Sequence, residues 1–324
     1  MGRFGSLLAQ HRALTFVIVT FALTWAYEFI VVYPLVDSDL ASFGGPGMIQ
    51  TFAIAVAMFF PALGVVITRL ITGDGFKHCV IKPYPLRKSL PWFLVAWFGP
   101  SVLIALGAVA YFCIFPNDFD PNGAQFSALI SSQLEAAGAP AELPMSIPMM
   151  ALVQIVVGTL LGPLLNLPAC FGEEWGWRGY LMPKLGQRLP IVPTLLISGV
   201  IWGLWHAPLT ALGHNYGVGY PGWPVLGIFA MCCFCTVVGI FLSYVTIRTG
   251  SCLAAAFGHG VINAVAGAST IFAIADVSPF VGPSPTGIIG GAFFIVVALW
   301  MLLDLRRRAR EGILVLPEAG KKDA

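Results

Sequence analysis

Two adjacent glutamates, Glu173 and Glu174, followed by Arg178, form a charged motif in a chain that otherwise avoids charge. The motif lies at the end of a long apolar run, and two further apolar runs each carry one histidine, His206 and His259. Ionisable groups at or within a bilayer are costly to keep, so they generally mark a site that handles water, protons or a polar substrate. Glutamate and histidine can also activate water as general bases. The pattern predicts a hydrolytic site in a membrane protein.

The two glutamates are expected to have different partners. On a helix, Glu174 and Arg178 are four residues apart and face one another, which suits an ion pair. Glu173 lies one position away, about 100° around the helix, and points elsewhere. One carboxylate is therefore expected to be neutralised by the arginine while the other stays free to act as a base. Taken alone, the motif is equally compatible with a solvated helix end.

Each histidine has a partner four residues away on the same helix face. Trp202 precedes His206, and Asn263 follows His259. A histidine and an asparagine stacked in this way offer two hydrogen-bond donors to one cavity, which suits the oxyanion formed when a carbonyl is attacked. A single intramembrane histidine is often a helix–helix hydrogen bond. Two histidines, together with the asparagine and the paired glutamates, favour a functional site.

The composition is that of an integral membrane protein. Apolar residues make up 58% of the 324 and charged residues 10%, whereas soluble domains carry about 25% charged residues. The formal net charge is only +2, and no basic groove with interleaved aromatic residues is present, which argues against a nucleic-acid partner. The seven cysteines show no disulfide framework, and most lie in apolar segments, where a thiol behaves as a small hydrophobic group.

Runs of about 20 apolar residues predict an all-α membrane protein with eight transmembrane helices in a single domain, residues 1–324. All 17 Lys and Arg residues fall on one side of this arrangement, so the positive-inside rule predicts cytosolic N- and C-termini, with residues 305–324 as a basic tail. The longest loop on the other side, 116–147, is expected to contain a short interfacial helix, Phe126–Ala137. The predicted spans are 13–35, 49–72, 91–115, 148–171, 191–212, 223–247, 252–274 and 285–304.

The order Glu-Glu-x-x-x-Arg, aromatic-x-x-x-His and His-x-x-x-Asn, each on or beside a separate apolar run, resembles the CPBP family. That family includes type II CAAX prenyl endopeptidases and bacterial proteins linked to bacteriocin self-immunity. The motifs occupy residues 170–265, the expected catalytic core. The family's second motif usually begins with Phe, and this chain has Trp202 there, which we expect to alter pocket shape more than chemistry. The resemblance implies an intramembrane glutamic endopeptidase in the cell membrane.

The resemblance also implies a role for each motif residue. Glu173 is expected to activate water with help from His206, while His259 and Asn263 stabilise the oxyanion. These residues meet only if helices 4, 5 and 7 enclose a polar cavity, which we expect to be water-filled and open to the cytosol. The expected substrate is a peptide or protein, prenylated or otherwise associated with the bilayer and cut near its C-terminus. The sequence predicts no oligomeric state.

The remaining polar groups are expected to be supporting or structural. The resemblance implies that Glu174 and Arg178 are mainly architectural. Glu28, inside the first predicted span, is expected to be structural, and His214 is expected to be solvated in an outer loop. Glutamate and two histidines are legitimate zinc ligands, but no His-Glu-x-x-His helix is present. We therefore expect a site without metal or another cofactor.

Two functions of other classes fit the same residues. A non-enzymatic immunity or scaffold protein would keep the motifs as a polar network between packed helices. A proton-coupled transporter would use the Glu and His residues as a relay, but the chain shows no inverted repeat of the kind secondary transporters use. The endopeptidase interpretation accounts best for the three motifs together.

Overall fold

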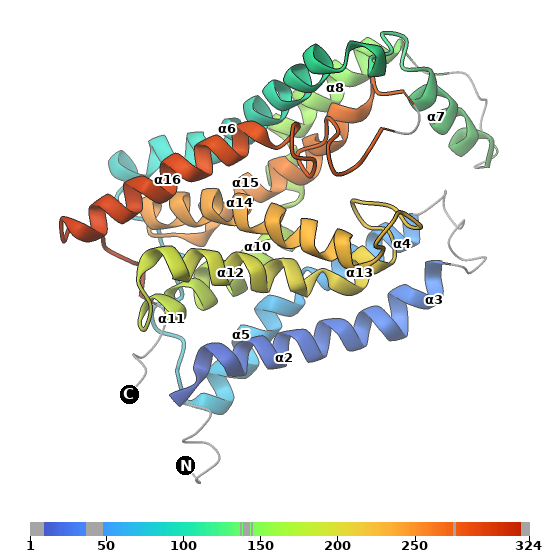
Figure 1. Ribbon diagram of the computed structural model, residues 1–324. Helices are drawn as coiled ribbons and strands as arrows, with labels where there is room; N and C mark the ends of the chain where they lie inside the picture. The colour runs from blue at the N-terminus through green and yellow to red at the C-terminus, as the bar shows by residue number, and fades with distance from the viewer. Residues whose placement is uncertain are drawn as a thin grey trace.

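The computed structural model describes residues 10–36, 48–136, 138, 143, 145–274 and 277–318. Within these ranges every regular element is a helix, and the only β-type pairing is one isolated bridge between Phe119 and Ala273. The helices run roughly side by side between two ends of one bundle (Figure 1). This arrangement confirms the all-helical class predicted from the sequence.

The N-terminal helices form one side of the bundle. The first predicted span is α2 (Arg12–Tyr27), which continues without a break through the π-helical turn η1 (Glu28–Val32) and α3 (Tyr33–Val36). It packs against α5 at a close approach, since a Cβ on Gly64 would lie 2.1 Å from Oγ1 of Thr20. The next elements are α4 (Met48–Ala57), α5 (Phe60–Thr72), α6 (Leu86–Ile114) and α7 (Ala124–Ala136).

The fourth predicted span, 148–171, is a broken helix rather than a continuous one. Proline cannot donate a backbone hydrogen bond, and Pro163 and Pro168 each stand at the start of a new helical piece. Helical structure then continues to Gly186, well beyond the predicted end, because the charged side chains that follow residue 171 are buried in the bundle. The pieces are α8 (Ile147–Leu160), α9 (Gly162–Leu165), α10 (Leu167–Gly176), the π-helical turn η4 (Trp177–Leu181) and α11 (Met182–Gly186).

The C-terminal half supplies the centre of the bundle. Helices α12 and α14 approach closely because glycine faces the contact: a Cβ on Gly203 would lie 2.4 Å from the Cα of Cys232. The last helix begins at Ala292, not at the predicted 285, because residues 279–291 form turns. The elements are α12 (Ile191–Trp205), α13 (Ala207–Ala211), α14 (Val225–Thr249), α15 (Cys252–Val265), the 3₁₀ turn η5 (Ala266–Thr270) and α16 (Ala292–Arg310).

Several helices are long and apolar enough to cross a membrane, so the protein is a multi-pass membrane protein. The structure contains five such helices among the described residues, and two shorter apolar helices, α8 and α12, lie among them. The predicted total of eight spans remains a prediction. The five are Arg12–Leu35, Thr51–Thr72, Leu86–Ile114, Val225–Thr249 and Cys252–Thr270.

Among the described residues, Lys and Arg gather at one end of the bundle. Arginine or lysine occurs in the last turns of α5, α11, α14 and α16, and these turns lie at the end of the bundle where α2 begins (Figure 1). We call this the basic end. Four long stretches of the sequence contain no Lys or Arg. They are residues 13–68, 89–177, 189–247 and 249–305.

Candidate active site

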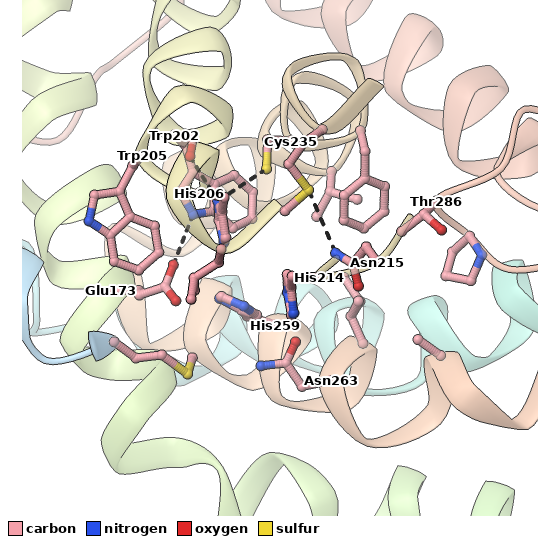
Figure 2. Close-up of a pocket in the computed structure, with 18 of the residues that line it drawn as sticks. Glu173, Trp202, Trp205, His206, His214, Asn215, Cys235, His259, Asn263 and Thr286 are labelled. Carbon is pink, nitrogen blue, oxygen red and sulfur yellow. Dashed lines mark hydrogen bonds between the residues drawn. The ribbon is translucent and has the colours of Figure 1, made fainter. Parts of the chain in front are cut away.

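The three sequence motifs meet at one cavity of about 280 Å³. Glu173 comes from α10, Trp202 and His206 from the end of α12, and His259 and Asn263 from α15, and all five line the cavity wall. Figure 2 shows their side chains around the same space. The fold thus brings together residues as far apart in the sequence as Glu173 and Asn263, which are 90 positions apart.

Glu173 is buried and held by two indole groups. Its side chain is 2% exposed, and its Oε2 accepts hydrogen bonds from Nε1 of Trp202 at 2.8 Å and from Nε1 of Trp177 at 3.3 Å. These donors fix the carboxylate at the cavity wall without neutralising it by a cation. Trp202 therefore bonds the glutamate directly, whereas the sequence predicted an effect on pocket shape more than on chemistry.

Glu174 joins Arg178 to His259. Its Oε1 accepts a hydrogen bond from Nη1 of Arg178 at 2.9 Å, which confirms the predicted i,i+4 pair, and another from Nδ1 of His259 at 2.9 Å. The Arg178 guanidinium also lies over the Trp202 ring, 4.1 Å from its centroid. Because a carboxylate can only accept, Nδ1 of His259 carries a proton and Nε2 is the nitrogen left for the cavity. Glu174 therefore orients a site residue in addition to its architectural role.

His206 sits where α12 ends and α13 changes the chain direction. Its Nδ1 lies 2.9 Å from the carbonyl oxygen of Trp202, and this oxygen can only accept. Nδ1 must therefore donate, and in the neutral ring the free Nε2 is a proton acceptor. The ring packs against Trp205, with 4.7 Å between centroids. His206 is thus oriented to take a proton from a group in the cavity.

Asn263 and His259 share one face of α15, as their spacing predicts. The Nδ2 of Asn263 donates a weak hydrogen bond to Sγ of Cys170 at 3.7 Å. Both residues line the cavity across from Glu173. The pair is placed where two donors could face a carbonyl oxygen bound between α10 and α15. The oxyanion role itself stays a prediction.

His214 was expected to be solvated in an outer loop, but it lines the cavity. It lies in the short turn after α13, only partly exposed, and its ring is parallel to that of His206 with 6.3 Å between centroids. Burial lowers the pKa of His214, so it is neutral at physiological pH. Its spacing in the sequence could have indicated this position. His214 follows His206 by only eight residues, so the turn that carries it must fold back over the end of α12.

Glu28 is buried in the first helix but does not line the cavity. Its side chain is 1% exposed, and neither carboxylate oxygen has a hydrogen-bond partner among the described residues. Glu28 therefore makes no hydrogen bond to any of the motif residues. Its structural role stays a prediction.

Within the described residues, the side chains that could bind a metal ion do not form a recognisable metal site. No group of three His, Cys, Asp or Glu side chains within the described ranges is arranged to hold one ion. The Nδ1 atoms of His206 and His259 and the Oε2 atom of Glu173 are each already engaged in hydrogen bonds. The atoms left for chemistry are therefore the Nε2 nitrogens and the remaining Glu173 oxygen.

The opening of the cavity to the cytosol, expected from the sequence, stays a prediction. That expectation placed Glu173 near the cytosolic end of a span that stops at 171. Because helical structure continues to Gly186, Glu173 lies deeper in the bundle. The cavity extends from there to Asn215 and Thr286, which lie toward the end without Lys or Arg.

Comparison with known proteins agrees with the motifs. A family model described as type II CAAX prenyl endopeptidase Rce1-like matches residues 148–265. Over these residues the chain is similar to the CAAX protease family. Among curated relatives, a protein named CAAX prenyl protease 2 from Methanococcus maripaludis is 42% identical over 53 residues, which is 16% of this chain and 19% of that relative. No solved structure matches. The resemblance drawn from the three motifs is confirmed.

The indole of Trp202 gives this protein a testable difference from CAAX-family members with phenylalanine at the corresponding position. Trp202→Phe removes the 2.8 Å hydrogen bond to Glu173 but keeps an aromatic ring under Arg178. A hydrogen bond to a charged group is worth about 1.5–3 kcal/mol, and its loss disfavours the carboxylate. We expect the acid limb of the pH profile of kcat/KM to move to higher pH. An unchanged profile would show that the indole does not act on Glu173.

Proposed function

We propose that the protein is an intramembrane endopeptidase in which Glu173 activates water to hydrolyse a peptide bond of a membrane-associated substrate. The observation that carries the proposal is the arrangement of Glu173, His206, His259 and Asn263 around one cavity. The family match of residues 148–265 supports a peptidase. The cell membrane is the proposed location.

The reaction begins with a water molecule between Glu173 and the free Nε2 of His206. Transfer of one proton from this water to the carboxylate produces the hydroxide equivalent that attacks the scissile carbonyl. The proton then passes to the nitrogen of the leaving amine as the carbon–nitrogen bond breaks. His206, oriented by the Trp202 carbonyl, accepts a hydrogen bond from the same water and directs its attack.

The negative charge that develops on the carbonyl oxygen is stabilised by donors from α15. Nε2 of His259 donates when the ring is protonated, and the Glu174 carboxylate, 2.9 Å from Nδ1, favours that charged form. The amide of Asn263 supplies the second donor. Donors fixed in advance by buried partners stabilise such an oxyanion well because little reorganisation is needed.

The chemistry does not require a metal ion in this proposal. Glu173 takes the proton from water, and the α15 donors hold the oxyanion, so both tasks that zinc performs in metalloproteases have a residue assigned to them. The substrate is proposed to be lipidated or otherwise anchored in the bilayer, as the family name suggests.

Two matched peptides test this function. Purified protein in detergent is incubated with quenched-fluorescent CAAX peptides that differ only in a farnesyl group on the cysteine. We expect cleavage of at least one peptide, with the new ends located by mass spectrometry. Faster cleavage of the farnesylated peptide would support a prenylated substrate. Cleavage of neither peptide, nor of membrane-anchored peptides from the host, would favour the immunity or scaffold alternative.

A further inference from the structure

We propose that a groove between α6, α14 and α16, at the basic end of the bundle, binds the headgroup phosphate of an anionic phospholipid. The groove shares no lining residue with the site cavity, so its ligand does not depend on the proposed reaction. The ligand is identified by its chemistry: a negatively charged phosphate group carried by acyl chains. The cations bind the phosphate, and the outer faces of the helices contact the chains.

Three cations from three helices line this groove, which has a volume of about 670 Å³. Lys88 comes from the first turn of α6, Arg248 from the last turn of α14 and Arg308 from the last turn of α16. No Asp or Glu is among the described residues that line it. Because α6 begins at the basic end and α14 and α16 end there (Figure 1), the three side chains share one space.

Lys88 lies where its own helix disfavours a cation. It is the third residue of α6, and the N-terminal end of a helix carries partial positive charge. The first turn of α6 contains no acidic residue and has no side-chain cap. The side chain is exposed, and within the described ranges it pairs with no carboxylate. An anion from outside the protein is therefore the partner that suits this position.

Arg248 is held over aromatic rings with its donors unused. Its guanidinium carbon lies 4.5 Å from the centroid of the Trp92 ring and 5.8 Å from that of Tyr244. Among the described residues, none accepts a hydrogen bond from this guanidinium. A guanidinium is a planar fork of N–H groups that can donate two parallel hydrogen bonds to a phosphate. The rings thus fix the orientation of Arg248 before a ligand binds.

Asp304 orients the third cation but neutralises only part of the charge. Nε of Arg308 donates to Oδ2 of Asp304 at 2.6 Å, and the hydroxyl of Tyr244 donates to the same oxygen at 2.9 Å. The other oxygen, Oδ1, accepts from Nη2 of Arg307 at 2.8 Å. Three lining cations and this one carboxylate leave a net formal charge of +2 before Arg307 is counted. The groove therefore attracts an anion.

All three cations lie just beyond the apolar spans predicted from the sequence. Lys88 is three residues from the nearer end of its span, Arg248 one residue and Arg308 four residues. At 1.5 Å per helical residue, each lies within about 6 Å of the apolar run, which is the level of phospholipid headgroups. Two aromatic side chains of the kind enriched at this level, Tyr84 and Trp92, also line the groove.

Exposed apolar surface for the acyl chains continues along the same helix faces. Val95 and Val102 follow the lining residues of α6 at helical spacing, and Val296 and Trp300 precede that of α16. These four side chains are between 36% and 64% exposed. The Trp300 ring also contacts that of Tyr244, with 5.9 Å between centroids. A soluble phosphate would leave this surface unused, whereas a phospholipid covers it, so the lipid is the better match.

Lipid binding by the purified protein tests the site without peptide cleavage. The protein is delipidated in an uncharged detergent and incubated with phosphatidylglycerol, which is anionic, with zwitterionic phosphatidylcholine, or with soluble glycerol 3-phosphate. Native mass spectrometry counts the retained molecules, and titration against the thermal transition gives each Kd, because a ligand that binds only the folded state raises Tm.

We expect one tightly retained phosphatidylglycerol per chain and a raised Tm. Phosphatidylcholine and glycerol 3-phosphate at the same concentration should give neither. Equal binding of phosphatidylcholine would overturn the requirement for negative charge. Equal stabilisation by glycerol 3-phosphate would assign the groove to a soluble phosphate and overturn the lipid.

Two variants and a matched control locate the binding. Lys88→Gln should weaken binding of phosphatidylglycerol about fivefold, the usual effect of one cation near an anionic headgroup. Arg248→Gln should weaken it about tenfold or more, because it removes hydrogen bonds to a charged group. Lys77→Gln loses the same charge from an exposed loop residue that does not line the groove, and it should stay within about twofold of wild type.

Equal losses in all three variants would indicate diffuse attraction to the basic end and contradict a site in the groove. Lys88 is exposed, so Lys88→Gln should have the thermal transition of the wild type when no lipid is added. Its weaker binding then reports the lost contact and not a loss of folding. Raising the salt concentration should weaken binding to the wild type more than to Lys88→Gln, since partly exposed charges are screened. Binding of the wild type that does not respond to salt would contradict the role of the cations.

Discussion

Replacement of Glu173 by glutamine should lower kcat/KM for peptide cleavage by roughly 10³- to 10⁴-fold, the upper range for loss of a general base. An amide cannot take a proton from water at neutral pH. The glutamine oxygen can still accept from the indoles of Trp202 and Trp177, which donate to Oε2 of the glutamate. The variant should therefore remain folded, with a thermal transition close to that of the wild type.

The matched control for this variant is Glu311→Gln. Glu311 is exposed at the end of α16 and pairs only loosely with Arg307, at 3.5 Å. Its replacement should leave cleavage within about twofold of wild type, because exposed ion pairs contribute little. Wild-type turnover by Glu173→Gln would remove Glu173 as the base. A loss of folded protein instead would show that the carboxylate is needed for structure.

The largest effect on stability is expected at Arg178. Arg178→Met leaves the Glu174 carboxylate buried at 0% exposure with His259 as its one remaining partner on Oε1. Removing one member of a buried ion pair typically costs about 3–5 kcal/mol. We expect the free energy of unfolding in mixed detergent micelles to fall by about that amount. Catalysis should fall as well, because Glu174 would no longer be held in place to orient His259.

Two further variants separate the lost pair from lost packing. Adding Glu174→Gln to Arg178→Met removes the unpaired charge and should recover part of the stability, giving a coupling energy of about 0.5–3 kcal/mol. Arg307→Met is the exposed control: its pair with Asp304 is 2.8 Å long, but the arginine side chain is 59% exposed. It should cost less than about 1 kcal/mol. Equal losses for Arg178→Met and Arg307→Met would contradict the buried network.

The spacing of the motifs was sufficient to predict the contacts made within one helix. Residues four apart on a helix share a face, and this gave the Glu174–Arg178 pair and the common direction of His259 and Asn263. The helical class followed from apolar run length, and a helix is present where a short one was predicted at 126–137, since α7 spans Ala124–Ala136. These features depend on local geometry alone.

Contacts between distant parts of the chain could not be predicted in this way. Lys184 lies between the predicted spans 148–171 and 191–212, yet Asp74, 110 positions away, pairs with it in the interior. That burial carries the helix past 171 and moves Glu173 deep into the bundle. The bond from Trp202 to Glu173 and the position of His214 beside His206 likewise depend on how α10, α12 and the following turn pack together.

The central claim is that Glu173 activates water in a site that needs no metal. The most direct test measures peptide cleavage by the wild-type protein after exhaustive chelation, together with the zinc content of the same sample by mass spectrometry. We predict unchanged kcat/KM in protein that contains far less than one zinc per chain. Activity that disappears on chelation and returns with stoichiometric zinc would contradict the claim and make Glu173 and the two histidines candidate zinc ligands.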